Sequence, residues 1–301
     1  MRWRGGRRSN NVEDRRGTSP GYSAAGAGGM MLLRLLPMML RSKVGRVVLI
    51  LGVVVVLGGK FLGIDLLPML LGGGSATVQS PREFSAEEQQ LADFVSVVLA
   101  DTEDSWRVIF NDLGGSYREP VLVLFSGQVR SACGFASAAV GPFYCPGDEK
   151  VYLDLSFFHD LATRFGAPGD FAQAYVVAHE VGHHVQTLLG ISQQVREAGQ
   201  GRSQADINEL SVRQELQADC FAGVWGHIAH RDRQLLEPGD LDEALQAASA
   251  IGDDRLQHRS GGEVVPDSFT HGTSEQRARW FRRGFESGDM ETCNTFATSR
   301  L

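Results

Sequence analysis

From residue 85 onward, apolar residues recur every three or four positions, which is the pattern of amphipathic helices. Ser85, with Glu88 three residues later, forms a capping box that starts the first helix. Thr273 and Gln276 form the same motif ahead of the last one. One predicted helix therefore begins at Ser85. The other predicted helices cover about 171–187, 207–230, 241–257 and 274–285.

Two short segments are typical of strands instead. Residues 120–125 (PVLVLF) form a compact apolar run, and residues 150–156 (KVYLDLS) alternate like a strand with one buried face. Helices outnumber strands and follow this short strand set, so the pattern predicts an α+β fold.

A longer apolar run over 44–66 stands apart from these patterns. Its uninterrupted centre, Val47–Gly59, has 13 residues, fewer than the roughly 20 that span a bilayer. Arg46 and Lys60 can reach the interface with their charged ends and bring the segment close to that length. We therefore predict a transmembrane helix over 44–66 and a flexible linker over 67–82. The alternatives are a buried strand or core helix of a soluble protein and, less favoured, a cleaved signal peptide.

The charge distribution indicates an orientation for such a helix. The whole chain carries a net charge of −7, but residues 1–46 carry +8 and residues 72–301 carry −15. Positively charged flanks stay on the cytoplasmic side of a membrane. This predicts a disordered basic cytoplasmic arm over 1–43, a single crossing of the cell membrane, and an extracytoplasmic domain over 83–301. The acidic balance argues against a nucleic-acid partner bound through bulk positive charge.

Four cysteines lie in the predicted domain. Cys133 and Cys145 bracket a segment with a Gly-Pro turn, which favours a disulfide between them, and Cys220 and Cys293 would form the other pair. The sequence alone allows three pairings, and four reduced buried cysteines are the alternative. Disulfides would agree with an exported domain.

A metal-binding pattern lies in the middle of the helix predicted over 171–187. His179 and His183 are four residues apart on one helix face, so both rings can reach one zinc ion at roughly 2.0–2.1 Å. Glu180 points to the neighbouring side, where it can act as a catalytic base toward water. Gly182 at mid-helix weakens the helix, and a close backbone crossing would explain it.

Zinc catalysis needs a third protein ligand, which the helix predicted over 207–230 can supply. Glu215 can complete a His-His-Glu set, and Asp219 can accept the free ring N–H of a ligand histidine. The alternative is that both are solvated surface carboxylates. Glu209 is a competing ligand, ranked second because its i+4 neighbour is Arg213.

Other polar side chains are weaker candidates. His271, at the start of the final helix, could polarise a substrate carbonyl in the transition state, as could Tyr152 or Tyr175. Each of these is more often structural. His184 directly follows the second predicted ligand and points away from its face, which favours a buried core histidine.

The chain resembles the bacterial neutral zinc metallopeptidases that have a single N-terminal membrane segment. The resemblance covers most of the chain outside the apolar run and the linker. It is carried by MRWRGGRRSNNVEDRR, ACGFASAAVGPFYCPGDEKVYLDLSFF, AYVVAHEVGHHVQ, RQELQADCFAGVW and DSFTHGTSEQRARWF. It implies a zincin-like fold, in which a small sheet lies above the helix with the HExxH motif and a second helix supplies a glutamate. On this sequence it implies one zinc ion held by His179, His183 and Glu215, with Glu180 as general base.

These observations predict a membrane-anchored zinc endopeptidase that hydrolyses peptide or protein substrates. The strand 151–155 would pair with an extended substrate backbone by strand addition. A second hypothesis is a non-catalytic zincin-fold module that binds a protein partner at the cell envelope. A third is a soluble cytoplasmic hydrolase with free thiols.

Overall fold

The computed structural model describes residues 1–18, 41–42, 83–261 and 263–301. Residues 1–18 and 84–301 belong to one compact unit. The predicted transmembrane helix over 44–66 and the linker over 67–82 lie outside the described residues. Among the helices that the structure does describe, none combines the length and the apolar character that a membrane crossing requires.

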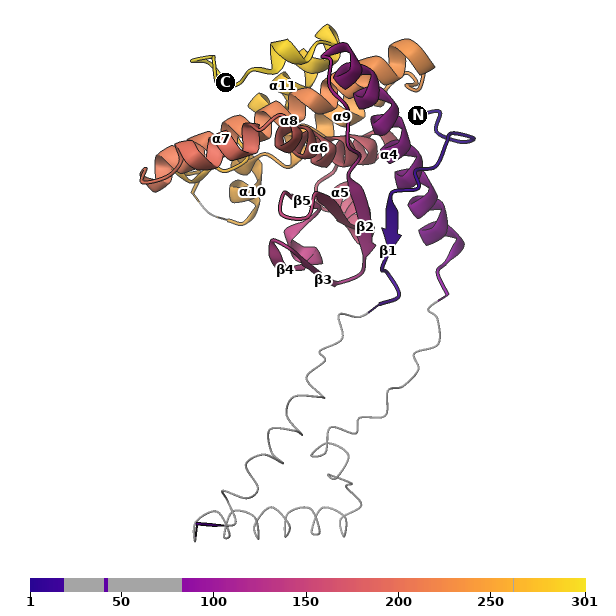
Figure 1. Ribbon diagram of the computed structural model, residues 1–301, viewed down its shortest axis with the longest axis horizontal. Coiled ribbons are helices and arrows are strands. Elements are labelled where there is room, and N and C mark those ends of the chain that lie inside the picture. Colours follow the sequence, from indigo (N-terminus) through magenta and orange to yellow (C-terminus); the bar gives the residue numbers. More distant parts are fainter. Residues whose placement is uncertain (19–40, 43–82, 262) are drawn as a thin grey trace. The chain divides into compact units, whose positions relative to one another are not determined.

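A four-stranded sheet forms one layer of the unit (Figure 1). Its strand order is β1–β2–β6–β5. The strands are β1 (Val12–Asp14), β2 (Val121–Phe125), β6 (Lys150–Asp154) and β5 (Phe143–Cys145). The first three are parallel, and β5 is antiparallel to β6 at the edge. A separate hairpin pairs β3 (Gln128–Ser131) with β4 (Gly134–Ser137).

Helices cover the sheet and form the other layer. They are α4 (Ala86–Asp112), α5 (Ser156–Thr163), α6 (Asp170–Leu188), α7 (Ile191–Ala198), α8 (Gln204–Arg233), α9 (Asp240–Ala250), α10 (Asp253–Arg259) and α11 (Ser274–Ser287), with short 3-10 turns at Ala138–Val140, Pro266–Ser268 and Met290–Cys293. The predicted capping boxes begin α4 at Ser85 and α11 at Thr273. A mixed α+β fold with a small sheet, compatible with a zincin-like domain, is therefore confirmed.

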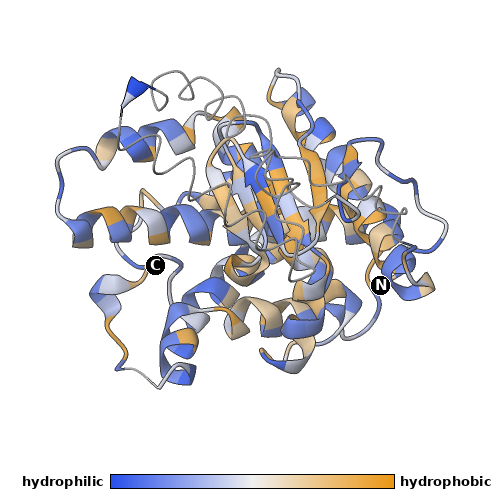
Figure 2. Ribbon diagram, turned by 90° about the horizontal axis from the view of Figure 1, so that it is seen from below, coloured by the Kyte–Doolittle hydropathy of each residue, from blue (hydrophilic) through white to orange (hydrophobic). Residues whose placement is uncertain are grey.

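The core lies where α6 packs between α8 on one side and the sheet on the other. Figure 2 shows strands with hydrophobic segments near the centre, surrounded by helices along which hydrophobic and hydrophilic residues alternate. Glycines permit the closest crossings. A Cβ on Gly182 of α6 would lie 2.9 Å from the Ala218 carbonyl oxygen of α8, and one on Gly284 of α11 would lie 1.9 Å from that of Cys220. The close backbone crossing expected at Gly182 is thus present.

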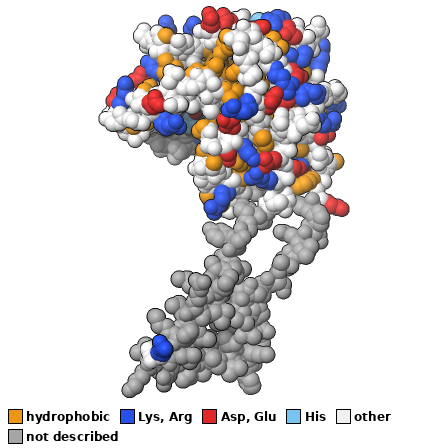
Figure 3. Space-filling model, viewed as in Figure 1, with side chains coloured by type: hydrophobic (Ala, Val, Ile, Leu, Met, Phe, Trp, Pro, Cys, Tyr) orange, Lys and Arg blue, Asp and Glu red, His pale blue; other side chains and the backbone are white. Residues whose placement is uncertain are grey.

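The N-terminal segment differs from the predicted disordered arm. Residues 1–18 pack on the unit, and β1 pairs in parallel register with β2. The buried Glu103 carboxylate of α4 accepts hydrogen bonds from the side chains of Ser9, Asn11 and Arg7. The prediction of disorder is wrong for residues 1–18, because β1 joins the sheet and Arg7 and Arg8 pair with acidic groups of α4. On the face seen in Figure 3, basic and acidic side chains are accordingly interspersed.

This packing also constrains the predicted membrane topology. The Arg16 guanidinium lies 4.0 Å from the centre of the Phe84 ring and donates to the Glu88 carbonyl oxygen at 3.0 Å. Residue 18 and residue 84, which flank the intervening segment, therefore belong to the same unit. A single crossing that separates residues 1–18 from residues 83–301 is incompatible with β1 lying in this sheet.

Three element predictions need correction. The helix predicted over 241–257 is two helices, α9 and α10. The helix breaks at Gly252, which packs so closely on Ser274 that a Cβ added to Gly252 would lie 2.4 Å from the Ser274 backbone nitrogen. The connection before α8 contains α7. The strand β6 has neighbours on both sides, so 151–155 is not an edge; the edges of the sheet are β1 and β5.

Replacement of Glu103 by Ala should lower the free energy of unfolding by about 1–3 kcal/mol, because it leaves Ser9 and Asn11 without their buried acceptor. Urea unfolding followed by circular dichroism measures this change. The matched control is Asp93→Ala, which removes an exposed partner of Arg8 on the same helix and should have no measurable effect. Equal effects of the two variants would contradict the role given to the N-terminal segment.

Candidate metal centre

Three candidate ligands meet where α6 and α8 cross. The Nε2 atoms of His179 and His183 lie 3.1 Å and 3.3 Å from the two carboxylate oxygens of Glu215. One ligand atom from each residue falls within 4.8 Å of the others. The i, i+4 spacing places the two rings next to each other on one face of α6, at nearly right angles. The crossing at Gly182 brings α8 close enough for Glu215 to face both.

The ring of His179 is held by Asp219. The fully buried Asp219 carboxylate accepts a hydrogen bond from His179 Nδ1 at 2.8 Å and from the Tyr175 hydroxyl at 2.5 Å. Because Nδ1 is engaged by Asp219, Nε2 is the ring nitrogen that faces Glu215 and the one that would be available to a metal ion. This is the supporting arrangement that metal-binding histidines commonly have.

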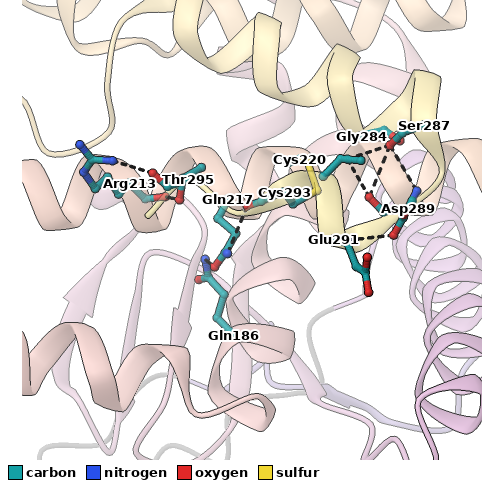
Figure 4. The surroundings of a disulfide bond; sticks show 11 residues. Gln186, Arg213, Gln217, Cys220, Gly284, Ser287, Asp289, Glu291, Cys293 and Thr295 are labelled. Carbon is teal, nitrogen blue, oxygen red and sulfur yellow. Dashed lines mark hydrogen bonds between the residues drawn. A yellow bond between two sulfur atoms is a disulfide. The ribbon is translucent and has the colours of Figure 1, made fainter. Parts of the chain in front are cut away.

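The ring of His183 has a different support. Its Nδ1 donates to the Gln186 side-chain oxygen at 2.9 Å, and Gln186 donates in turn to the Gln217 side-chain oxygen at 3.0 Å. Gln217 then donates to the Cys293 carbonyl oxygen at 3.2 Å. Figure 4 shows the part of this chain from Gln186 through Gln217 to Cys293, beside the disulfide between Cys220 and Cys293. The second ring therefore also exposes Nε2.

A buried arginine, which the sequence reasoning missed, completes the surroundings of His179. Arg277 of α11 donates to both oxygens of Asp219, at 2.9 Å and 3.0 Å, and to the Tyr175 hydroxyl at 3.1 Å. Its guanidinium lies 3.4 Å from His179 Nδ1. The sequence did contain a signal, because Arg277 shares the buried face of α11 with Trp280 and Phe281 at helical spacing.

The electrostatics of the centre favour an ionised Glu215. Burial alone would raise the pKa of Glu215, but the imidazoles of His183 and His179 hold it well below its usual range. Burial alone would lower the pKa of His179, but the carboxylates of Asp219 and Glu215 raise it to about 10. Glu215 is thus ionised and faces a proton on His179, and a divalent cation could take the place of that proton.

Glu180 has a different environment. It is buried beside the three candidate ligands, and burial raises the pKa of its carboxyl group. Among the described residues it has no hydrogen-bond or ion-pair partner, although it lines the cleft above α6. A buried, unpartnered carboxyl group that faces a cleft can accept and return a proton.

The residues present fit a zinc ion. Two imidazole nitrogens and one carboxylate are a known catalytic zinc set, in which a fourth position remains for water or substrate. Each imidazole has its outer nitrogen already engaged, which fixes the tautomer needed for coordination. Glu209, the competing ligand, instead pairs with Arg213 at 2.8 Å on the surface of α8.

A cleft of about 870 Å³ opens above this centre. The edge strand β5 and the Gly141–Pro142 turn before it form one wall, and α6 forms the floor. Tyr144 of β5 donates to His184 Nδ1 at 3.2 Å, while His184 Nε2 donates to the Arg118 carbonyl oxygen at 2.6 Å. The buried His184 therefore connects the edge strand to the helix that carries the candidate ligands.

The three weaker candidates for polarising a substrate carbonyl lie in different surroundings. His271 lines the cleft, and its Nδ1 lies 3.2 Å from the largely buried Asp253 carboxylate. The Tyr175 hydroxyl is engaged by Asp219, as described above. Tyr152 donates to Asp148 at 2.7 Å and packs in a small cluster with Val123, away from the ligands.

Both disulfides lie close to the site. Cys133–Cys145 joins the β3–β4 turn to the edge strand β5. Cys220–Cys293 joins α8, one residue after Asp219, to the C-terminal 3-10 turn. In the described part of the chain no cysteine is free. The bonds therefore fasten two elements that carry the cleft wall and the support of His179.

Comparisons with known proteins extend along nearly the whole chain. A family model described as "Putative neutral zinc metallopeptidase" matches residues 1–296. The chain is 53% identical over 299 residues to the uncharacterized protein YpfJ of Escherichia coli strain K12, a match that covers 99% of this chain and 100% of the relative. It is 44% identical over 218 residues to the uncharacterized protein Rv2575 of Mycobacterium tuberculosis strain H37Rv, covering 69% and 73%. No solved structure matches.

Proposed function

The chain belongs to the neutral zinc metallopeptidase family, and on that premise we propose that it is a zinc-dependent endopeptidase with Glu180 as its general base. The observation that carries the proposal is the meeting of His179, His183 and Glu215 at the floor of an open cleft, with the unpartnered Glu180 beside them. A purely structural zinc site would be closed by a fourth protein ligand.

The residues of the chain divide the reaction between them. A zinc ion held by His179, His183 and Glu215 would supply Lewis-acid chemistry, which polarises a scissile carbonyl and lowers the pKa of a water molecule toward 7. Glu180 would accept a proton from the attacking water and return it to the leaving amine. Asp219 and Gln186 keep both imidazoles oriented throughout.

His271 is the proposed stabiliser of the developing oxyanion. Asp253 accepts from the backbone N–H groups of residues 270–272 and faces His271 Nδ1. Among the described residues Nε2 of His271 has no hydrogen-bond partner, and the side chain lines the cleft. His271→Ala should lower kcat by about 10²-fold with little change in KM. Steady-state kinetics on a fluorogenic peptide test this, and an unchanged kcat would remove His271 from the mechanism.

A comparison of proteome-wide cleavage products tests the proposed function. Zinc-loaded protein is incubated with a denatured proteome, and new peptide termini are compared with those from the Glu180→Gln variant. We expect termini that appear only with the unchanged protein and disappear with a hydroxamate inhibitor. Identical terminus profiles, with zinc bound in both samples, would favour the non-catalytic module instead.

We further propose that the folded unit lies outside the cytoplasm and is held at the membrane through residues 44–66. The two disulfides support an oxidising compartment, and the apolar run supports membrane attachment. Alkylation of intact cells before lysis, followed by mass spectrometry, should find all four cysteines blocked by disulfides in the membrane fraction. Free thiols in the soluble fraction would contradict the proposal.

A further inference from the structure

The cleft has two chemically different ends. Val176 lies one helical turn before His179 on α6 and marks one end. Around it the cleft is lined by half-buried apolar side chains from α5, the loop after α5, the residue that ends α9, and α10. These side chains are Phe157, Phe165, Ile251 and Leu256. The charged groups at this end, Asp160 and Arg164, neutralise each other in an ion pair of 2.9 Å.

The other end, beyond His183, is polar and basic. Ser192 of α7 lies 3.3 Å from Thr187 near the end of α6 and accepts a hydrogen bond from Gln214 at 3.2 Å. Arg196, one turn further along α7, lines the same part of the cleft and is exposed. Among the described residues, Arg196 has no carboxylate partner within ion-pair distance. A substrate carboxylate could therefore pair with it.

The wall of the cleft gives these ends a direction. The turn before β5 starts at the apolar end, because a Cβ on Gly141 would lie 3.5 Å from the Phe157 ring. Tyr144 of β5 reaches His184, which is beyond both candidate ligands on α6. The edge strand thus runs from the apolar end to the basic end. A peptide added antiparallel to it would enter with its amino side at Arg196 and its carboxyl side at Val176.

We infer that the substrate is an extended peptide with a large apolar residue on the carboxyl side of the cleaved bond and an acidic residue on its amino side. This inference rests on the proposed peptidase function and specifies its substrate class. The apolar residue would fill the space between Val176, Phe165 and Leu256. The acidic residue would pair with Arg196.

Cleavage-site profiling of the zinc-loaded full chain on a proteome-derived peptide library tests the inference. We expect Leu, Ile, Phe or Met immediately after the cleaved bond and enrichment of Asp or Glu two to four residues before it. Arg196→Glu should change the kcat/KM ratio of matched Glu and Lys peptides by about fivefold or more in favour of Lys. Phe165→Ala and Leu256→Ala should each lower the preference for Phe over Ala by about tenfold.

The control is Arg202→Glu, an exposed arginine outside the cleft, which should leave the profile unchanged. Because Arg196 is exposed, its variant remains informative even if a variant of the apolar end misfolds. Cleavage without these positional preferences, or with the opposite polarity, would overturn the inference and leave the peptidase function standing. No cleavage by the zinc-loaded protein would overturn both.

Discussion

Replacing Glu180 by Gln is expected to reduce kcat by about 10²–10⁴-fold while one zinc ion remains bound per chain. Gln fills nearly the same volume in the buried position but cannot accept the proton of the attacking water. The ligands His179, His183 and Glu215 are untouched by the change, so zinc affinity should stay within about threefold.

Steady-state assays with a fluorogenic peptide measure kcat, and metal analysis of the same samples measures the zinc bound per chain. Glu237→Gln is a matched control, because this glutamate lies outside the cleft on the loop before α9. Retained hydrolysis in the Glu180 variant would refute the assigned base. Loss of zinc from it would leave the activity loss unexplained by proton transfer.

Replacing Arg277 by Met should lower the free energy of unfolding by about 3–5 kcal/mol, because the Asp219 carboxylate would stay buried without the guanidinium that pairs with both of its oxygens. The affinity for zinc should fall by about 10–100-fold, since Asp219 would hold His179 less firmly. Urea unfolding measures the first change and competition with a chelator measures the second.

Two further variants test whether the effect of Arg277→Met comes from the loss of its charge. Arg279→Met removes a partly exposed arginine two residues away on α11 and should change neither quantity measurably. The double variant Asp219→Asn with Arg277→Met removes both buried charges and should be more stable than Arg277→Met alone. If the double variant were the less stable one, the charge-pairing account of Arg277 would be wrong.

The sequence predicted most of what lies on helices. The capping boxes at Ser85 and Thr273 mark the starts of α4 and α11, because each uses only residues three positions apart. The pairing of His179 with His183 follows from helical spacing for the same reason. Glu215 could be predicted as a ligand because a carboxylate on an apolar, buried stretch of helix needs a partner.

Features that depend on contacts between distant segments were not predicted. The charge of residues 1–18 indicated a solvated arm, whereas their partners, such as Glu103, lie about ninety positions away in the chain. The break between α9 and α10 depends on the backbone of Ser274 lying against Gly252. The edge position of β5 depends on strand order, which alternation within one strand does not encode.

The resemblance of the first sixteen residues to the family was the available signal that this segment belongs to the domain. A charge pattern reports how residues meet solvent and membrane, but it does not report which residues are already paired. The family likeness of that segment is therefore better evidence that it belongs to the domain than the charge asymmetry is evidence for a separate arm.

X-ray absorption spectroscopy of the zinc-loaded full chain tests the central claim most directly. The account predicts one zinc ion per chain, coordinated by two imidazole nitrogens and by oxygen atoms that include an exchangeable water. The Glu215→Gln variant should lose most of its zinc, and the Glu209→Gln variant should keep it. A spectrum without imidazole scattering, or a Glu215→Gln variant with unchanged zinc affinity and coordination, would contradict the assignment of the centre.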